Sequence, residues 1–234
     1  MLVSIIIPAY NEKNHIIEII NNIIEKVNYK TQIIVVDDFS DDGTTEILKV
    51  KLASKIDEIV YHKKNLGKGA AIKSSLPFIK GDVVAIQDAD LEYDPIDLNN
   101  LISLIVEGKT NVAYGSRVLG KLRYTNKNFI SKFRILGNHM LTTLSNLLNN
   151  QNLTDAHTCY KVFKVNIFRK LKLKENDFAF CPEVTTKISL LNEKIIELPI
   201  NYNGRSVAEG KKIRAYDSIR AIFTLLKYRF SKFN

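Results

Sequence analysis

Two aspartates, Asp88 and Asp90, stand just after the apolar run Val83–Ile86. In an extended chain, residues two apart point to the same side, so these carboxylates can converge on one point. Two like charges at that spacing repel each other unless a cation lies between them. Their oxygens suit Mg²⁺ or Mn²⁺, and Mg²⁺ commonly combines one or two carboxylates with the phosphate oxygens of a substrate. The pair therefore predicts a divalent-cation site that a diphosphate completes.

The same stretch also has a purely structural interpretation. Asp94 precedes Pro95, and this order is typical of a helix cap followed by the first helical residue. The DxD pattern is short, so it does not by itself exclude a polar strand end. Both interpretations stay open on these residues alone.

Two more loops carry candidate binding groups. Asp37 and Asp38 follow the apolar run 33–36 directly. We expect Asp38 to stay free to accept hydrogen bonds from a base or ribose, while residues 40–42 cap the next helix. The segment NLGKG, residues 65–69, lacks the GxxxxGK[ST] pattern of a phosphate loop. We expect its Lys68 to contact phosphate, with a plain turn before a helix as the alternative.

The elements that must position these loops alternate along the chain. Short apolar runs predict strands over 2–7, 32–36, 59–62, 83–87 and 111–114. Helical periodicity between them predicts helices over about 16–27, 44–53 and 68–79, and another from Pro95. This α/β order predicts one mostly parallel, Rossmann-like sheet with helices on both faces. Ligands of such sheets bind at the carboxyl ends of the strands, where these loops lie.

Charge divides the chain into two halves. Residues 1–116 carry 12 Lys and Arg against 17 Asp and Glu, a net charge of −5, whereas residues 117–234 carry 22 against 8, a net charge of +14. The basic half contains two expected amphipathic helices, 129–148 and 216–230. A basic amphipathic helix can lie on an anionic membrane surface. We favour this for 129–148, whereas core packing and membrane contact are equally open for the last helix.

Other features of the sequence bear on location. No stretch approaches the ~20 apolar residues that cross a bilayer, and the N-terminus lacks the pattern of a secretory leader. Cys159 and Cys181 have no CxxC partner, so we expect buried thiols in a reducing compartment. The histidines have no partner that the sequence identifies, and we expect structural or surface roles for His15, His62, His139 and His157.

The ordered motifs resemble a known family. SIIIPAYNE, VVDDFSDDGT, NLGKGAA, QDADLEYDP and YGSR resemble the nucleotide-sugar-binding half of glycosyltransferase family 2, which has the GT-A fold. Further along, TCYKVFK, CPEVTTKI, ELPINY and RSVAEGKK resemble the dolichol-phosphate mannosyltransferase branch and its bacterial polyprenyl-phosphate glycosyltransferase relatives. The resemblance implies a single GT-A domain over 1–234, with a nucleotide-sugar-binding half, 1–116, and an acceptor- and membrane-facing half, 117–234.

The resemblance also implies roles for individual residues. The nucleoside pocket would be lined by Pro8, Tyr10, Glu12 and Asp38. The metal, Mg²⁺ or Mn²⁺, would be held by Asp88, Asp90 and Glu92, although many relatives have Gln at position 92. Phosphate groups of the donor and the acceptor would be met by Arg117, Arg205, Lys211 and Lys212. The catalytic residues would be Asp90, Arg117 and Arg205.

Two positions depart from the family pattern. Relatives often carry an acidic residue within TDxETCYK and another just before the following PE. This chain has His157, preceded by Ala156, at the first position and Cys181 at the second. The choice of acceptor or sugar could differ there.

The reaction that the resemblance implies is a metal-dependent, inverting hexose transfer. The donor would be a nucleoside-diphosphate sugar of the GDP-mannose or UDP-glucose class, and the acceptor a dolichyl or undecaprenyl phosphate at the cytoplasmic face of a membrane. A lipid phosphate needs no general base, because its second pKa is about 6 and it is anionic at neutral pH. The need for a membrane-spanning partner protein stays open.

Two other functions stay open. A sugar hydroxyl acceptor, in polysaccharide or glycoconjugate synthesis, would require a carboxylate base, for which Glu183 at the start of a predicted helix is the candidate. Glu183 could instead only complement the helix dipole. A non-catalytic basic adaptor or nucleic-acid-binding protein would show salt-sensitive binding. We expect no nucleic acid partner, because the acidic strand ends would repel a polyanion.

Overall fold

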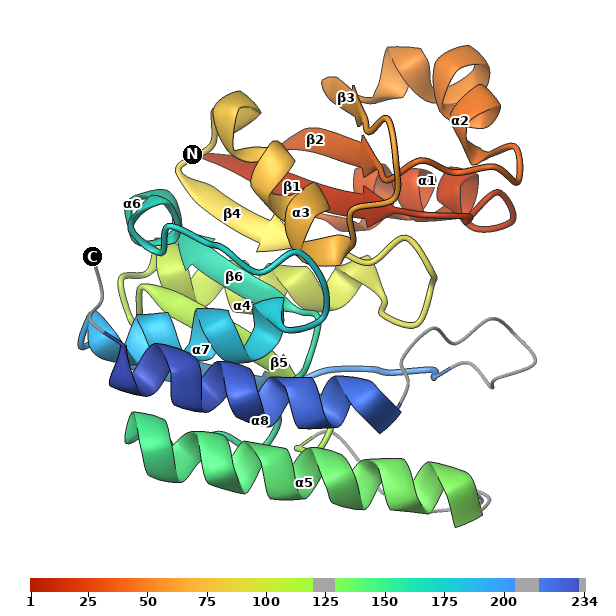
Figure 1. Ribbon diagram of the computed structural model, residues 1–234. Coiled ribbons are helices and arrows are strands. Elements are labelled where there is room, and N and C mark those ends of the chain that lie inside the picture. The colour runs from red at the N-terminus through yellow and green to blue at the C-terminus, as the bar shows by residue number, and fades with distance from the viewer. Residues whose placement is uncertain (120–128, 205–214, 232–234) are drawn as a thin grey trace.

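Seven strands form one sheet in the part of the chain that the structure, a computed structural model, describes (Figure 1). The described residues are 1–119, 129–204 and 215–231, with the backbone alone at 129–134 and 215–217. The order of the strands across the sheet is β3-β2-β1-β4-β6-β5-β7. Their bounds are Leu2–Ala9 (β1), Lys30–Asp37 (β2), Glu58–Tyr61 (β3), Val83–Ile86 (β4), Val112–Ser116 (β5), Lys161–Lys164 (β6) and Ile195–Pro199 (β7).

The sheet is mostly parallel, as predicted. β1 pairs in parallel with β2 and β4, β2 with β3, and β5 with β7. β6 runs antiparallel to both of its neighbours, β4 and β5. The sequence analysis did not predict β6 or β7. In β6 a lysine stands at each end, Lys161 and Lys164, so only two apolar residues remain and no apolar run marks the strand.

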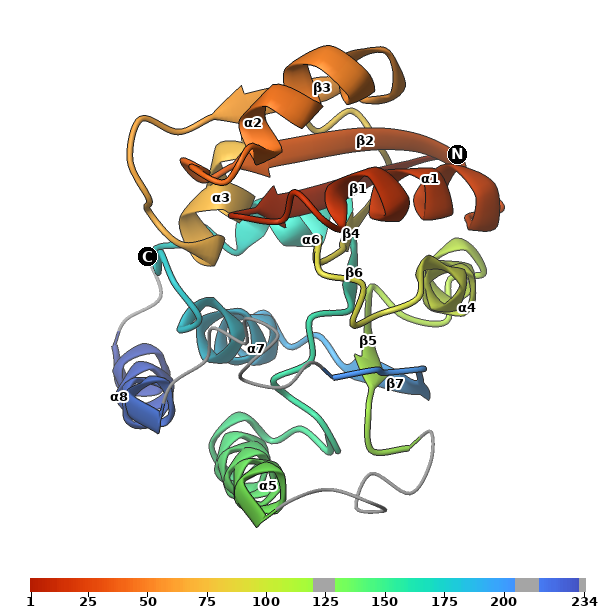
Figure 2. The same cartoon turned by 90° about the vertical axis from the view of Figure 1, so that its right-hand side faces the viewer.

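Helices cover both faces of this sheet. Figure 2 shows α1 and α4 on one face and α3, α6 and α7 on the other. α5 and α8 pack against α7 and against each other. The helix bounds are Ile16–Lys26 (α1), Thr44–Ile47 (α2), Lys68–Ser74 (α3), Leu98–Val106 (α4), Phe129–Asn149 (α5), Val165–Lys170 (α6), Phe180–Leu190 (α7) and Ala215–Phe230 (α8).

Two predicted helices change form before their expected ends. The helix predicted over 44–53 is α-helical only in α2 and continues as a π-helical stretch, Leu48–Leu52. The helix predicted over 68–79 ends as α3 at Ser74 and gives way to a 3₁₀ turn, Leu76–Phe78. Pro77 lies in that turn, and proline has no N–H to continue an α-helix.

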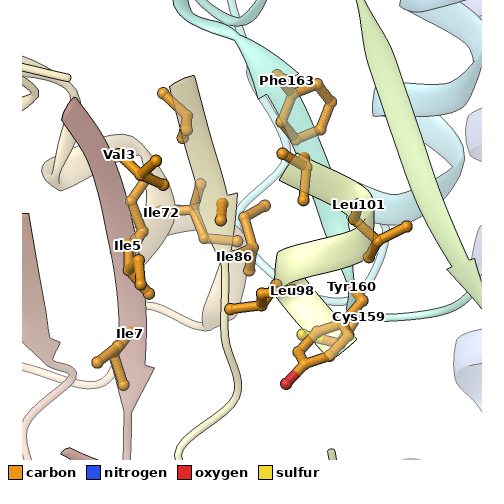
Figure 3. Close-up of a cluster of buried hydrophobic side chains, with 14 of the residues drawn as sticks. Val3, Ile5, Ile7, Ile72, Ile86, Leu98, Leu101, Cys159, Tyr160 and Phe163 are labelled. Carbon is orange, nitrogen blue, oxygen red and sulfur yellow. The ribbon is translucent and has the colours of Figure 1, made fainter. Parts of the chain in front are cut away.

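The hydrophobic core and the register of the sheet align the strand ends that carry the candidate site residues. Ile72 of α3, Ile86 of β4 and Leu98 of α4 belong to one buried cluster (Figure 3). Along the sheet, Ala9 pairs with Asp37 and Asp37 pairs with Tyr61. β1, β2 and β3 therefore end level with one another, and the loops that follow them begin at one edge of the sheet.

Candidate active site

The loops after β1 and β2 are tied together at this edge. The backbone N–H of Asn11 donates to Ser40 Oγ at 2.9 Å, and that of Glu12 donates to Thr44 Oγ1 at 2.9 Å. Asp42 accepts a hydrogen bond from the Thr44 N–H at 2.9 Å. The prediction that residues 40–42 cap the next helix therefore holds for Asp42 alone, because the side chains of Ser40 and Asp41 bind Asn11 instead.

The residues expected to line a nucleoside pocket lie along this joined edge. Pro8 and Tyr10 are partly buried, and Glu12 is buried. Glu12 Oε2 lies 2.8 Å from His15 Nδ1. The structure thus gives His15 a carboxylate neighbour that the sequence did not identify.

Asp38 is not free, and that expectation was wrong. Its buried carboxylate accepts hydrogen bonds from the N–H groups of Leu66 and Gly67, at 2.8 and 2.7 Å. Its Oδ1 also lies 2.6 Å from Nδ1 of His62. These partners all come from the segment after β3, whose position against Asp38 cannot be read from the DD pair. Asp38 therefore fixes the glycine-rich loop that leads into α3.

Lys68, at the start of α3, forms an ion pair with Asp88 beyond the end of β4. Its Nζ donates to Asp88 Oδ1 and lies 3.3 Å from Cys159 Sγ. Burial raises the pKa of Asp88, but the charge of Lys68 and a hydrogen bond from Cys159 outweigh it, so this pKa lies below its ordinary value. Burial lowers the pKa of Lys68, but Asp88 raises it well above its ordinary value. Both groups are therefore charged at neutral pH.

The acidic loop after Asp88 turns back towards the segment that follows β7. Asp90 Oδ1 accepts the Glu92 N–H at 3.2 Å, and Glu92 Oε2 accepts the Tyr202 hydroxyl at 2.8 Å. The Asn203 N–H donates to the Glu92 carbonyl oxygen at 2.9 Å. Tyr202 therefore holds the side chain of one predicted metal ligand, a role that the sequence analysis did not assign.

Arg117 lies across Tyr202 from this acidic loop. Its guanidinium donates to Asp155 at 2.6 and 2.8 Å, and its Cζ lies 5.2 Å from the centroid of the Tyr202 ring. Burial lowers the pKa of Arg117, but the Asp155 carboxylate raises it well above its ordinary value. Two predicted site residues, Arg117 and Glu92, therefore meet through Tyr202. The ELPINY motif contains this tyrosine and was the available signal.

Buried aromatic rings and thiols pack against residues of the candidate site. The Tyr93 ring lies 4.8 Å from that of Tyr160 and 5.1 Å from that of Tyr202, between centroids. The Cys159 N–H donates to the Tyr93 hydroxyl at 3.2 Å. Cys159 and Cys181 are free and buried, as the sequence predicted.

Glu183, the base required by a hydroxyl acceptor, is fully buried in the first turn of α7. Its Oε1 accepts from the Lys174 N–H at 2.7 Å and from Lys187 Nζ at 2.6 Å, and its Oε2 accepts from the Glu175 N–H at 2.8 Å. This geometry is that of a structural carboxylate, and it does not favour the role of a general base.

The structure does not test every predicted site residue. Arg205, Lys211 and Lys212 lie outside the described residues. Across 1–119, 129–204 and 215–231, no three His, Cys, Asp or Glu side chains are grouped so as to hold a metal ion. Asp88, Asp90 and Glu92 therefore do not form a complete metal site by themselves.

The fold and the placement of these loops define the class of the protein. A mostly parallel sheet whose acidic loop follows β4 at the carboxyl edge is the GT-A fold, as expected. Glucosyl-3-phosphoglycerate synthase from Mycobacterium tuberculosis, solved with Mn²⁺ and uridine diphosphate, matches with a TM-score of 0.70 at 18% identity, over 97% of this chain and 79% of that one. S. aureus TarS residues 1–349, solved with UDP-GlcNAc, matches with a TM-score of 0.60 at 17% identity, over 97% and 66% of the two chains.

Residues 4–172 match the family model described as glycosyl transferase family 2, and the chain belongs to this family. It is 29% identical over 236 residues to the dolichol-phosphate mannosyltransferase of Pyrococcus furiosus, covering 97% of this chain but only 64% of that protein. It is 28% identical over 254 residues to the UDP-N-acetylglucosamine–dolichyl-phosphate N-acetylglucosaminyltransferase of Methanococcus voltae, covering 99% and 97%. The relatives are of the branch that the sequence predicted.

Proposed function

We propose that this protein transfers a hexose, with inversion, from a nucleoside-diphosphate sugar to a polyprenyl phosphate. The observation that carries the proposal is that one side chain, Tyr202, contacts both an acidic and a basic site residue. The hydroxyl of Tyr202 donates to Glu92 of the acidic loop, and its ring lies against the guanidinium of Arg117. An acidic side suited to a cation and a basic side suited to phosphate thus adjoin at one edge of the sheet. The names of the family relatives support this acceptor class.

The donor set fits a divalent metal that is held in part by its substrate. Carboxylates are hard ligands suited to Mg²⁺ or Mn²⁺. The described residues do not bring three such ligands together, which agrees with a cation held by one or two carboxylates plus diphosphate oxygens. Asp88 and Asp90 would hold it, with Glu92 as the third candidate. When bound, the cation would supply positive charge that stabilises the departing diphosphate.

The protein's own residues would mainly position the reactants. Asp38 and the loops after β1 and β2 would shape the nucleoside side of the site. Arg117, held by Asp155 in one orientation, would present a fixed cation to a phosphate. A phosphate acceptor needs no base, and the burial of Glu183 supports such an acceptor over a sugar hydroxyl.

The outer surface of α5 and α8 supports a lipid acceptor. The described part of the chain has no helix of the length and apolar character needed to span a bilayer. Both helices nevertheless expose large apolar side chains, namely Leu136, Met140, Leu147, Ile219, Ile222, Phe223, Leu226 and Phe230. With the net charge of +14 on 117–234, this surface suits the headgroup region of an anionic membrane. We propose peripheral attachment there, at the cytoplasmic face.

The sugar and the base of the donor are left to experiment, because the relatives named above use different sugars. The test offers purified protein with Mn²⁺ or Mg²⁺, a panel of GDP- and UDP-sugars, and either polyprenyl phosphate or an oligosaccharide in detergent. We expect a metal-dependent glycosyl phosphate lipid from one donor. D90N should abolish it, whereas E107Q, an equivalent carboxylate-to-amide change in the exposed turn after α4, should not. A product formed only on the oligosaccharide would refute the proposal.

A further inference from the structure

We propose that the Lys68 ammonium stays paired with the Asp88 carboxylate until a nucleotide diphosphate binds. The divalent metal and the nucleotide therefore bind cooperatively. The inference rests on the proposed function, because it takes Asp88 as a metal ligand. It adds a role for Lys68 that a simple phosphate contact does not include, which is control of access to the metal site.

The starting observation is the ion pair itself. Lys68 Nζ donates to Asp88 Oδ1, and the side chains are only 16% and 20% exposed. Cys159 Sγ lies 3.3 Å from the same ammonium. A cation that entered to bind Asp88 would lie beside a partly buried positive charge, and the two cations would repel each other. A metal would therefore bind Asp88 more tightly once the ammonium has moved away.

The backbone around Lys68 does not offer the necessary movement. A Cβ added to Gly69 would lie 2.5 Å from the carbonyl oxygen of Glu175, so the start of α3 is in close contact with that segment. The Ala70 N–H also donates to the Asn176 carbonyl oxygen at 2.9 Å. The change must therefore come from the Lys68 side chain, a flexible four-carbon stem with a compact charge.

A displaced ammonium needs a new anion. Without nucleotide, the largely buried Lys68 ammonium would give up the carboxylate that it contacts, which is costly. A nucleotide diphosphate brings phosphate oxygens that can accept the ammonium while Asp88 turns to the metal. Each ligand therefore favours the binding of the other, and this coupling is reciprocal.

The test measures Mn²⁺ affinity directly, by electron paramagnetic resonance of free Mn²⁺, with and without UDP or GDP. We expect wild-type protein to bind Mn²⁺ at least ~10-fold more tightly when the cognate nucleotide is present. K68M should bind Mn²⁺ alone ~10-fold more tightly than wild type, and nucleotide should then add correspondingly less. K68R keeps a cation beside Asp88 and should behave as wild type. K64M, which removes an exposed lysine of the same loop, should also leave Mn²⁺ binding unchanged.

Repeating the Mn²⁺ measurement in the D88N variant shows whether the effect of K68M depends on Asp88. In D88N the effect of K68M on Mn²⁺ affinity should disappear, because the contact that Lys68 controls is already gone. Near-ultraviolet circular dichroism of each variant verifies folding. An unchanged or weaker Mn²⁺ affinity in K68M, or an effect that persists in D88N, would overturn the inference while leaving the proposed function intact. Absence of Mn²⁺ binding to wild-type protein with either nucleotide would instead overturn the metal site, and the inference with it.

Discussion

Arg117 and Asp155 form a bidentate ion pair, in which the Arg117 side chain is 9% exposed and the Asp155 side chain 1% exposed. The pair joins the residue that follows β5 to the segment that precedes β6. Two charges removed from water in this way stabilise the fold only while both are present, because either one alone is left uncompensated. The cation proposed to meet phosphate is therefore also a structural group.

Removal of the charge of Arg117 should lower the free energy of unfolding. We expect R117M to lose ~3–5 kcal/mol, because the buried Asp155 carboxylate would lose the guanidinium charge that pairs with it. Urea unfolding followed by circular dichroism measures the loss. K109M removes a lysine whose partner, Glu107, is exposed, and it should cost below ~1 kcal/mol. Similar losses in the two variants would show that the Arg117 pair contributes no more than a surface pair.

Alanine substitutions at two glycines should change the free energy of unfolding in opposite directions. In G69A the new Cβ would lie 2.5 Å from the Glu175 carbonyl oxygen and 3.0 Å from the Asn176 carbonyl carbon. Both contacts are with backbone, so the chain must shift, and we expect a loss of ~1–3 kcal/mol. In G137A, within α5, the Cβ meets nothing within 4 Å, and a gain of up to ~1 kcal/mol is expected. Thermal unfolding midpoints that move in the same direction would contradict this prediction.

His157 should make stability depend on pH in the mildly acidic range. Burial, together with the charge of Lys161, lowers the pKa of His157 to about 4. The unfolded chain has a histidine pKa near ~6.5, so between these values the unfolded state binds more protons and stability rises with pH. The contribution is present at neutral pH and is lost as the pH falls from about 6.5 to about 4, by at most ~3 kcal/mol.

The measurement compares wild type with H157Q. Urea unfolding at pH 4.5 and pH 7 gives the change in stability for each protein, and the difference between the two changes isolates His157 from other titrating groups. The pH-dependent loss should be smaller in H157Q. An equal loss in both proteins would mean that His157 is solvated enough to titrate normally.

Membrane attachment should depend on the exposed apolar side chains of α5 and α8. We expect L147E and F223E each to weaken binding to anionic lipid vesicles by ~10-fold or more, because a side chain of this size gains ~1.5–3 kcal/mol on burial in an apolar medium. V50E is the matched control, since Val50 and Leu147 are both 81% exposed but Val50 lies far along the chain, after α2. Vesicle sedimentation measures the binding. Equal effects of L147E and V50E would indicate attraction by charge alone.

Local patterns predicted five of the seven strands that the structure describes, together with the functional edge. The apolar runs before Asp37 and Asp88 are short and are followed at once by carboxylates, so strand ends could be read directly. Asp94 accepts the Ile96 N–H at 3.2 Å, as its place before Pro95 predicted. These features depend on neighbours within a few residues, which a sequence displays.

Partners distant in sequence could not be predicted in the same way. The ion pair of Lys68 with Asp88 and the hydrogen bond of Tyr202 to Glu92 depend on how the strands are ordered across the sheet. β6 decides part of that order, and its two end residues, both lysines, break the apolar run that marked the other short strands. The motifs therefore indicated which residues gather at the edge, but not which of them hold one another.

The amphipathic helices show a second limit. A stripe at helical spacing shows that a face is apolar, but not whether protein covers it. In the amphipathic helix predicted over 216–230, the apolar residues at helical spacing include Ile219, Phe223 and Phe230, and the structure leaves all three exposed. α8 instead buries Leu225 and Tyr228. Core packing, one of the two interpretations left open for that stripe, is therefore wrong for these residues.

The reversed strand β6 has a consequence for the nascent chain. β4 pairs with β1 on one side and with β6 on the other. During translation, β6 is synthesised only after β5 and α5. Until then, the fully buried residues of β4 have an unpaired edge, which is a template for association with another chain. A chain that stops before Lys161 would carry the nucleotide-side loops on a sheet prone to self-association. Once it has been synthesised, the short strand that closely follows Cys159 covers this edge of β4.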